Sequence, residues 1–166
     1  MVEIFKLVLK ELFEHVRLYK VKSSSYASQI TVQPETVIGN GIKLKGTIFS
    51  ETKLIIEGEI EGNIECNNMV IVKGKVIGDI RCESAEIDNG CIEGNIDVSS
   101  KVIIKEGGKI IGQVRGGYVE VSGKVKGDII AKKSIILHSN AYVFGDAEAL
   151  IVSIGTGAYV EGTVII

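Results

Sequence analysis

The chain has 166 residues, the size of one domain. Its formal net charge is −2 and aromatic residues make up 5% of it, so it lacks both the positive charge and the stacking side chains of a nucleic-acid-binding protein. Three cysteines, an odd number, argue against a disulfide framework, and no N-terminal stretch has the uninterrupted apolar core of a secretory signal. These features predict a cytoplasmic protein with no nucleic-acid partner.

The first predicted element is an amphipathic helix within residues 1–22. Its apolar residues follow steps of three and four, the period of one helix face. The face is formed by Ile4, Phe5, Val8, Leu9, Leu12, Phe13 and Val16. Charged residues interrupt the segment too often for it to span a bilayer. Three roles remain open: the helix lies on a membrane surface, binds a partner protein, or caps the open end of the domain that follows.

Residues 23–36 are predicted to be a linker. They begin with three consecutive serines and contain Pro34, the only proline of the chain. Such a composition is typical of a flexible connection. We therefore expect the folded domain to cover residues 37–166.

A short repeat fills this domain. It consists of an apolar residue, any residue, glycine, a residue that is usually small and polar, and another apolar residue, as in Ile60-Glu61-Gly62-Asn63-Ile64. The repeated glycines are Gly46, Gly62, Gly78, Gly94, Gly112, Gly127, Gly145 and Gly162. The first four are sixteen residues apart, and the later steps vary between fifteen and eighteen. A unit this short cannot bury a core alone, so the copies must stack into a solenoid.

Each predicted coil consists of short strands. Ile and Val dominate the repeats and alternate with polar residues, which is typical of β-structure. Three short strands consume the length of one repeat, and glycine suits the bends between them because it tolerates positive φ and close backbone approach. Ile55, Ile71, Ile87 and Ile103, also sixteen apart, are expected to form one column. The fold class is therefore all-β, a single β-helix domain of about eight coils.

Signatures of an enzyme or a cofactor site are missing from the sequence. The dipeptide Gly74-Lys75 and its two later counterparts are followed by Val or Ile, which excludes a phosphate-binding loop. Of the two histidines, only His138 lies in the solenoid, so a zinc site of three histidines cannot form in one chain. Cys66 and Cys82 occupy equivalent positions and are expected to stack as small apolar residues. We expect no catalytic residue, metal, nucleotide or other cofactor.

The glycine-centred repeats, the coil length and the short segment before the solenoid resemble the bactofilins, a bacterial family of polymer-forming cytoskeletal proteins. The resemblance covers residues 36–166 and rests on repeats such as Val76-Ile77-Gly78-Asp79-Ile80. It implies a right-handed β-helix that polymerises through its ends without nucleotide. It also implies a scaffold for cell shape, envelope growth or motility, with an N-terminal segment that reaches the inner membrane in several members.

The residues also favour polymerisation by a physical argument. A β-helix has two open ends, each a set of unpaired strand edges over an apolar core, and soluble solenoids normally cover them with polar caps. Here both terminal coils are apolar. The predicted polymer interface consists of Ile38, Ile42, Leu44, Ile48, Phe49, Tyr159, Val160, Val164, Ile165 and Ile166. Two alternatives remain: an acyltransferase trimer of the hexapeptide type with His138 as its base, and a monomeric adaptor capped by its N-terminal helix.

Overall fold

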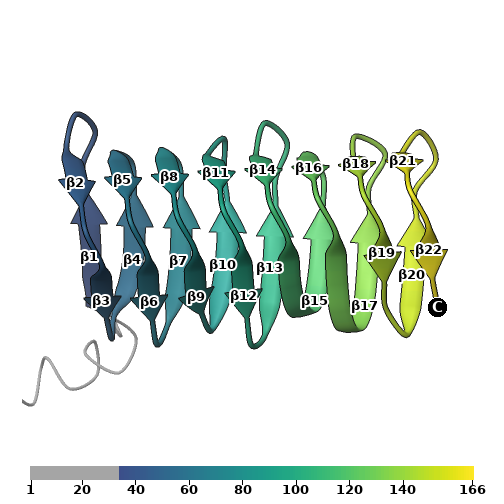
Figure 1. Cartoon of the computed structure of the whole chain (residues 1–166), viewed down its shortest axis with the longest axis horizontal. Helices are drawn as coiled ribbons and strands as arrows, with labels where there is room; N and C mark the ends of the chain where they lie inside the picture. The colour runs from purple at the N-terminus through teal and green to yellow at the C-terminus, as the bar shows by residue number, and fades with distance from the viewer. Residues whose placement is uncertain (1–33) are drawn as a thin grey trace, which may run out of the picture. The chain divides into compact units, whose positions relative to one another are not determined.

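A computed structural model describes residues 34–166, which form one solenoid of short parallel strands (Figure 1). Every helix or strand assigned in this range is a strand, and the first begins at Glu35. The predicted helix over residues 1–22 and residues 23–33 of the predicted linker lie outside the described residues. The strands lie on three faces, which we number in the order the chain visits them.

Face 1 consists of β1 (Glu35–Ile38), β4 (Lys53–Ile56), β7 (Met69–Val72), β10 (Ser84–Ile87), β13 (Lys101–Ile104), the C-terminal parts of β15 (Val114–Val121) and β17 (Ile129–Leu137), and β20 (Ile151–Ile154). Face 2 consists of β2 (Lys43–Lys45), β5 (Glu59–Glu61), β8 (Lys75–Ile77), β11 (Cys91–Glu93), β14 (Lys109–Ile111), β16 (Lys124–Lys126), β18 (Tyr142–Phe144) and β21 (Tyr159–Glu161). Face 3 consists of β3 (Ile48–Ser50), β6 (Ile64–Cys66), β9 (Ile80–Cys82), β12 (Ile96–Val98), the N-terminal parts of β15 and β17, β19 (Ala147–Glu148) and β22 (Val164–Ile165).

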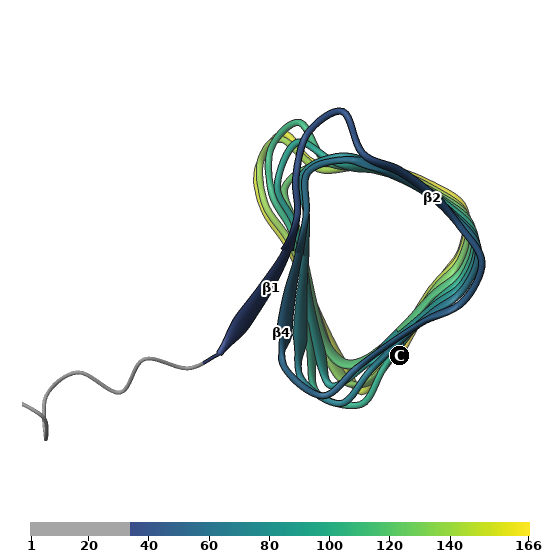
Figure 2. The same cartoon turned by 90° about the vertical axis from the view of Figure 1, so that its left-hand side faces the viewer.

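The chain passes once over each face per coil. Face 2 contains eight strands, which gives eight coils, and all pairs between neighbouring coils are parallel. Seen from its N-terminal end, the solenoid winds clockwise as its coils recede from the viewer (Figure 2). This is a right-handed coil, the hand that connections between parallel strands nearly always take. The predicted right-handed β-helix is confirmed.

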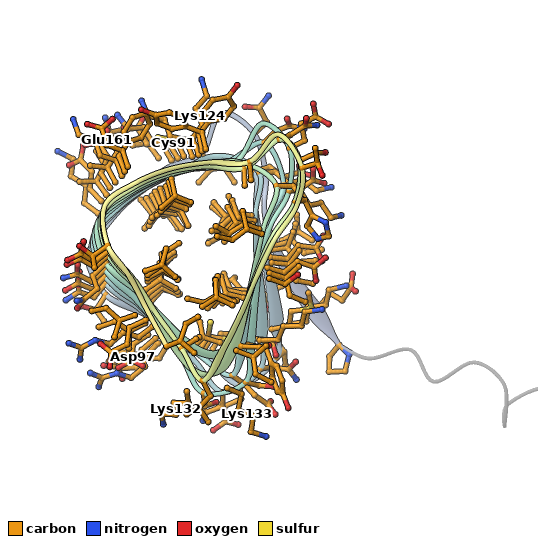
Figure 3. All side chains as sticks on the ribbon, turned by 90° about the vertical axis from the view of Figure 1, so that its right-hand side faces the viewer. Cys91, Asp97, Lys124, Lys132, Lys133 and Glu161 are labelled. Carbon is orange, nitrogen blue, oxygen red and sulfur yellow. The ribbon has the colours of Figure 1, made fainter. Side chains whose placement is uncertain are left out.

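The interior is a stack of apolar columns. Because side chains alternate along a strand, the middle residue of each three-residue strand on face 2 points inward, as in Ile60, Val76 and Ile92. Within residues 34–166 the buried set contains no polar or charged residue. Figure 3 shows the separation, with apolar side chains inside and charged ones outside. Each buried Ile or Val contributes about 1.5–3 kcal/mol, so the repeat itself supplies the stability of the fold.

The repeated glycines are required at one bend of every coil. Gly78 has a φ of 143°, and a Cβ there would overlap the carbonyl oxygen of Gly62 on the preceding coil. The same relation recurs between Gly94 and Gly78 and continues to the last coil. Both predicted reasons for glycine, the positive φ and the close approach of backbone, therefore apply.

Where the residue after a repeated glycine is Asn or Asp, it stabilises the stack. The backbone N–H of Asp79 donates to Oδ1 of Asn63 at 3.1 Å, and that of Asn95 donates to Oδ1 of Asp79 at 2.9 Å. The same bond links Gln113 to Asn95 at 3.1 Å. Each side chain thus satisfies a backbone donor of the next coil. This ladder of hydrogen bonds accounts for the recurrent Asn and Asp residues without a bound ion.

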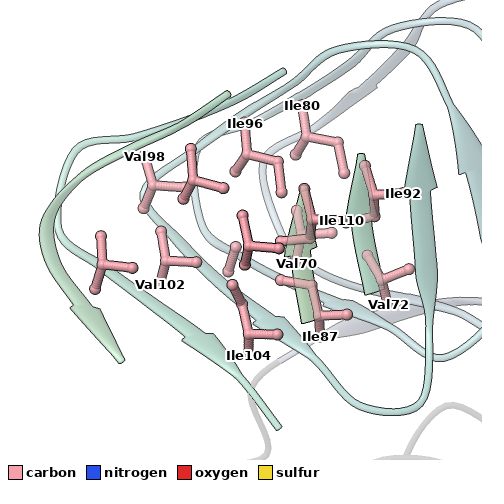
Figure 4. Packing of buried hydrophobic residues seen from close by; sticks show 14 of the residues in the cluster. Val70, Val72, Ile80, Ile87, Ile92, Ile96, Val98, Val102, Ile104 and Ile110 are labelled. Atoms are coloured by element: carbon pink, nitrogen blue, oxygen red, sulfur yellow. The ribbon is translucent and has the colours of Figure 1, made fainter. Parts of the chain in front are cut away.

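One predicted column is wrong. Ile87 aligns with Val72 and Ile104 on the inner wall, whereas Ile71 aligns with Glu86 on the outside. The bend before β10 is one residue shorter than the equivalent bend before β7, and the bend after β10, which holds Asn89 at a φ of 57°, is one residue longer. Together the two changes leave the spacing of the repeated glycines at sixteen residues. They shift β10, which lies between the two bends, by one residue relative to the repeat. Figure 4 shows Val72, Ile87 and Ile104 packed in the core.

Candidate assembly surfaces

The first and last coils carry unpaired strand edges. Of the strands in the first coil, β1 pairs only with β4, β2 only with β5 and β3 only with β6. In the last coil, β20 pairs only with β17, β21 only with β18 and β22 only with β19. Each end of the described residues therefore offers three parallel edges to an incoming strand.

The N-terminal end also exposes the inner columns. Leu44 aligns with Ile60, but Leu44 is 38% exposed whereas Ile60 is fully buried. Ile48 continues the column of Ile64 and is only partly buried, while Ile38 is buried. Among residues 34–166 no coil precedes this one, so the apolar surface is the cross-section of the core.

The C-terminal end has the same character. Val160 and Val164 continue the columns of Val143 and Ala147, which are fully buried, yet Val164 is 36% exposed and Val160 is partly buried. Figure 1 shows the chain ending at the edge of this coil, beyond β22. The two ends are thus alike in exposing core positions.

Not all the predicted interface residues lie in the core columns. Phe49, Tyr159 and Ile165 alternate with inward residues and occupy outward columns, where their neighbours are Glu65, Tyr142 and Glu148. Ile42 precedes β2 in an exposed bend, and the terminal residue Ile166 is exposed.

The sequence interpretation missed two end residues. Ile154 and Val152 of β20 continue the buried columns of Leu137 and Ile135, and Ile154 is 51% exposed at the open end. Both residues precede the last glycine repeat. They could have been found from the sequence by counting one coil onward from Ile135 and Leu137 of β17. Together with Val160 and Val164, they extend the exposed core section over all three faces.

Face 2 carries ion pairs near the N-terminal end. Lys45 Nζ lies 3.1 Å from Glu61 Oε2, and Lys43 Nζ lies 3.4 Å from Glu61 Oε1. Hydrogen bonds from the two lysines lower the pKa of Glu61, that from Lys45 most. Glu59 and Lys75 align on neighbouring coils, and such a cross-strand alignment favours an opposite-charge contact. Lys75 Nζ instead lies 3.5 Å from Glu93 Oε1. These pairs are solvent-exposed and add little stability.

Near the C-terminal end, face 2 becomes aromatic. The ring centroids of Tyr142 and Tyr159 are 6.2 Å apart, and those of Phe144 and Tyr159 are 5.8 Å apart. Phe144 lies in the same outward column as Ile111, as the repeat predicts. Lys124 Nζ lies 5.7 Å from the ring centroid of Tyr142. The face thus offers exposed apolar surface beside positive charge.

His138, the histidine considered as a catalytic base, has two charged neighbours. His138 Nε2 lies 2.7 Å from Glu120 Oε1, and Lys101 Nζ lies 2.9 Å from Glu120 Oε2, in an exposed cluster on the outside of the helix. Burial raises the pKa of the Cys82 thiol to about 12, as for an inert core cysteine. Among residues 34–166, no group of His, Cys, Asp or Glu side chains is placed to hold a metal ion. No membrane-spanning helix is found in the described part of the chain.

Comparison with known proteins assigns the family. The family model described as "Bactofilin: Polymer-forming cytoskeletal" matches residues 36–95 and 89–165. The chain is similar to bactofilin BacO of Myxococcus xanthus (strain DK1622), with 24% identity over 143 residues that cover 86% of this chain and 88% of BacO. Comparison with solved structures gave no significant match. Since the family matches span nearly the whole β-helix, the chain belongs to the bactofilins, a family of polymer-forming cytoskeletal proteins.

Proposed function

We propose that this protein is a structural, non-enzymatic component of the cytoskeleton that assembles end to end, without nucleotide, into filaments. The filaments scaffold partner proteins at or near the inner face of the cytoplasmic membrane, in cell shape, envelope growth or motility. The observation that carries the proposal is that the same core columns are open at both ends of the β-helix. One column runs from Leu44 to Val160, and another runs from Ile48 to Val164.

Assembly would use the forces that fold the monomer. Stacking one molecule on another extends the parallel hydrogen-bond ladder beyond β20, β21 and β22 and removes apolar side chains from water. Each apolar side chain that becomes fully buried at the contact stabilises it by up to about 1.5–3 kcal/mol. Nothing in this process needs a phosphate-transfer step or a cofactor.

Residues 1–22 would connect the filament to its surroundings. Their predicted amphipathic character suits a membrane surface or a partner protein, and a mild excess of positive charge favours anionic lipid. In a filament, many weak anchors of this kind act together, so the assembly binds more strongly than one chain does.

Negative-stain electron microscopy of the purified full-length chain, without nucleotide or metal, tests the proposal. We expect filaments from the wild type and none from Val160→Asp or Val164→Asp, because each puts a charge into the apolar end. Ser153→Asp is the matched control: it adds the same charge to the outward side of the last coil. Filaments that persist in both Val160→Asp and Val164→Asp would contradict assembly through the ends.

If no filaments form, the mass of the particles separates the alternatives. Uniform particles with the mass of three chains would favour a transferase trimer. Particles of one chain would favour the adaptor, and deletion of residues 1–22 should then trigger assembly that the full chain lacks.

A further inference from the structure

Face 3 presents one outward side chain per coil, and these side chains form a single column. Within the described residues, successive members align in register from the first coil to the sixth. In order, they are Phe49, Glu65, Arg81, Asp97, Arg115 and Ile130. Acidic and basic residues alternate from Glu65 to Arg115, with Phe49 before them and Ile130 after them, and the column continues with Glu148 and Ile165 in the last two coils.

The column is a ridge between two grooves. One groove, of about 310 Å³, lies between the ridge and the Asn/Asp ladder, from Asn63 to Gln113. The other, of about 520 Å³, lies between the ridge and the next corner, which includes Glu83 and Lys132. Glu65, Arg81 and Asp97 line both grooves, and Arg115 lines the first. Figure 3 shows Asp97 and Lys132 projecting outward on this side of the solenoid.

The charges of the ridge are available to a partner. All four are solvent-exposed, and none of the ion pairs within 4 Å among residues 34–166 includes Glu65, Arg81, Asp97 or Arg115. Phe49 is 74% exposed, a high value for a large aromatic side chain. An exposed apolar group beside unpaired alternating charges is typical of a contact surface rather than of a solvated face.

We propose that face 3 pairs with face 3 of a second copy of this chain, with the two solenoid axes antiparallel. A two-fold axis between the third and fourth coils places Arg81 opposite Asp97 of the second copy, and Glu65 opposite Arg115. It also places Phe49 opposite Ile130. By symmetry every contact occurs twice, so four opposite-charge pairs and two apolar pairs form.

The flanks of the ridge agree with this alignment. On one flank, Glu51 of the first coil faces Lys132 of the sixth coil of the second copy, and Glu83 faces Ser99. On the other flank, the same symmetry sets Asp79 of the ladder against the amide of Asn95. No like charges meet on either side.

Parallel pairing in register and a small antiparallel shift both bring like charges together. If the two solenoids are parallel and their coils are in register, each charged ridge residue faces the identical residue of the second copy. An antiparallel shift by one coil, about 4.8 Å, sets Glu65 against Asp97 in one direction and Arg81 against Arg115 in the other. A parallel pairing shifted by one coil also opposes unlike charges, but it forms three such pairs instead of four and sets Phe49 against Glu65. Charge and apolar matching together therefore favour the antiparallel register.

The size of the contact suits a filament better than a free dimer. Six coils span roughly 24–29 Å, and with a ridge and two flanks the contact buries less than the roughly 800 Å² per partner of a standard interface. A single pair is therefore weak, and repetition along two neighbouring assemblies strengthens it. The pairing surface shares Phe49 with the predicted polymer interface, but Phe49 lies in the outward column of the first coil and not in the open core section that end-to-end assembly would bury.

Cross-linking of engineered cysteines tests the proposal on the full-length chain with Cys91→Ser. Positions 49 and 130 are five coils apart, about 24 Å, within one chain, and at least three coils, about 14 Å, apart between stacked molecules. A bismaleimide with a reach of about 8 Å cannot bridge either distance. Across two paired faces the backbones are about 10 Å apart, and both sulfur atoms point into the contact, so the same reagent can join them there. We expect covalent dimers from Phe49→Cys/Ile130→Cys and none from either single variant.

Charge reversal adds a second test in the double-cysteine background. Arg81→Glu should lower the dimer yield about tenfold, and Asp97→Arg in the same chain should raise it again by restoring opposite charges across the axis. Lys126→Glu, the same change on face 2, should leave the yield unchanged. Dimers from a single-cysteine variant, no dimers from the double variant, or equal losses from Arg81→Glu and Lys126→Glu would each overturn the proposed pairing.

Discussion

Oδ1 of Asp79 accepts a hydrogen bond of 2.9 Å from the backbone N–H of Asn95, one coil further along the solenoid. Asp79→Ala removes this acceptor and should lower the free energy of unfolding by about 0.5–1.5 kcal/mol. Asp79→Asn keeps the acceptor and should change little. Urea denaturation in the Val164→Asp background, which is expected to remain unassembled, measures both. Equal losses in the two variants would show that the charge, and not the ladder, matters.

Gly78→Ala should destabilise the solenoid far more than Gly41→Ala. Both residues have positive φ, but a Cβ at Gly78 overlaps backbone of the preceding coil, whereas nothing lies within 4 Å of a Cβ at Gly41. We expect a loss of about 1–2 kcal/mol at Gly41 from the backbone conformation alone. At Gly78 we expect about 4 kcal/mol or more, or failure to fold. Similar melting temperatures for the two variants would contradict the close approach of the coils.

The stability of the fold should depend on Glu120 at acidic pH. Hydrogen bonds from Lys101 and then His138 lower the pKa of Glu120 below its usual 4.5. The unfolded state therefore binds this proton at higher pH than the folded state, so the stabilisation is complete above about pH 4.5 and is lost as pH falls through the lower pKa of the folded protein. Between about pH 5 and pH 3, the melting temperature of Glu120→Gln should fall less steeply with decreasing pH than that of the wild type. An identical pH profile for both proteins would count against this contribution.

The three thiols should react in two classes. Cys66 and Cys82 are buried, and burial raises the pKa of Cys82 to about 12, whereas Cys91 is half-buried on face 2. Since the thiolate is the reactive species, a thiol reagent should label one cysteine rapidly in the folded protein and three in denaturant. Cys91→Ser should remove the rapid phase. A rapid phase that survives this substitution would show that the core opens readily.

Several features of the site could be predicted because they repeat. Ile77, Ile111 and Phe144 do share an outward column with charged residues, since the glycine repeat fixes the strand that precedes it. The exposed Ile154 is not among the predicted interface residues, because it belongs to face 1, which lies outside the repeated glycine motif. Glu59 pairs with Lys43 and not with the aligned Lys75, because the alignment of two backbones does not decide which of several lysines a carboxylate meets.

By itself, the sequence determined the architecture: glycines at one bend of each coil and alternating Ile and Val specify stacked strands around an apolar core, because only stacking buries so short a repeat. The tertiary structure decided the register between coils. A bend shortened by one residue before Ser84 and another lengthened by one after Ile87 leave the repeat period unchanged, yet they turn Ile87 inward and Glu86 outward. That register decides which charges meet on the surface and which core columns stay open at the ends. The reason is that each side chain contacts residues of the neighbouring coils rather than its neighbours in the sequence.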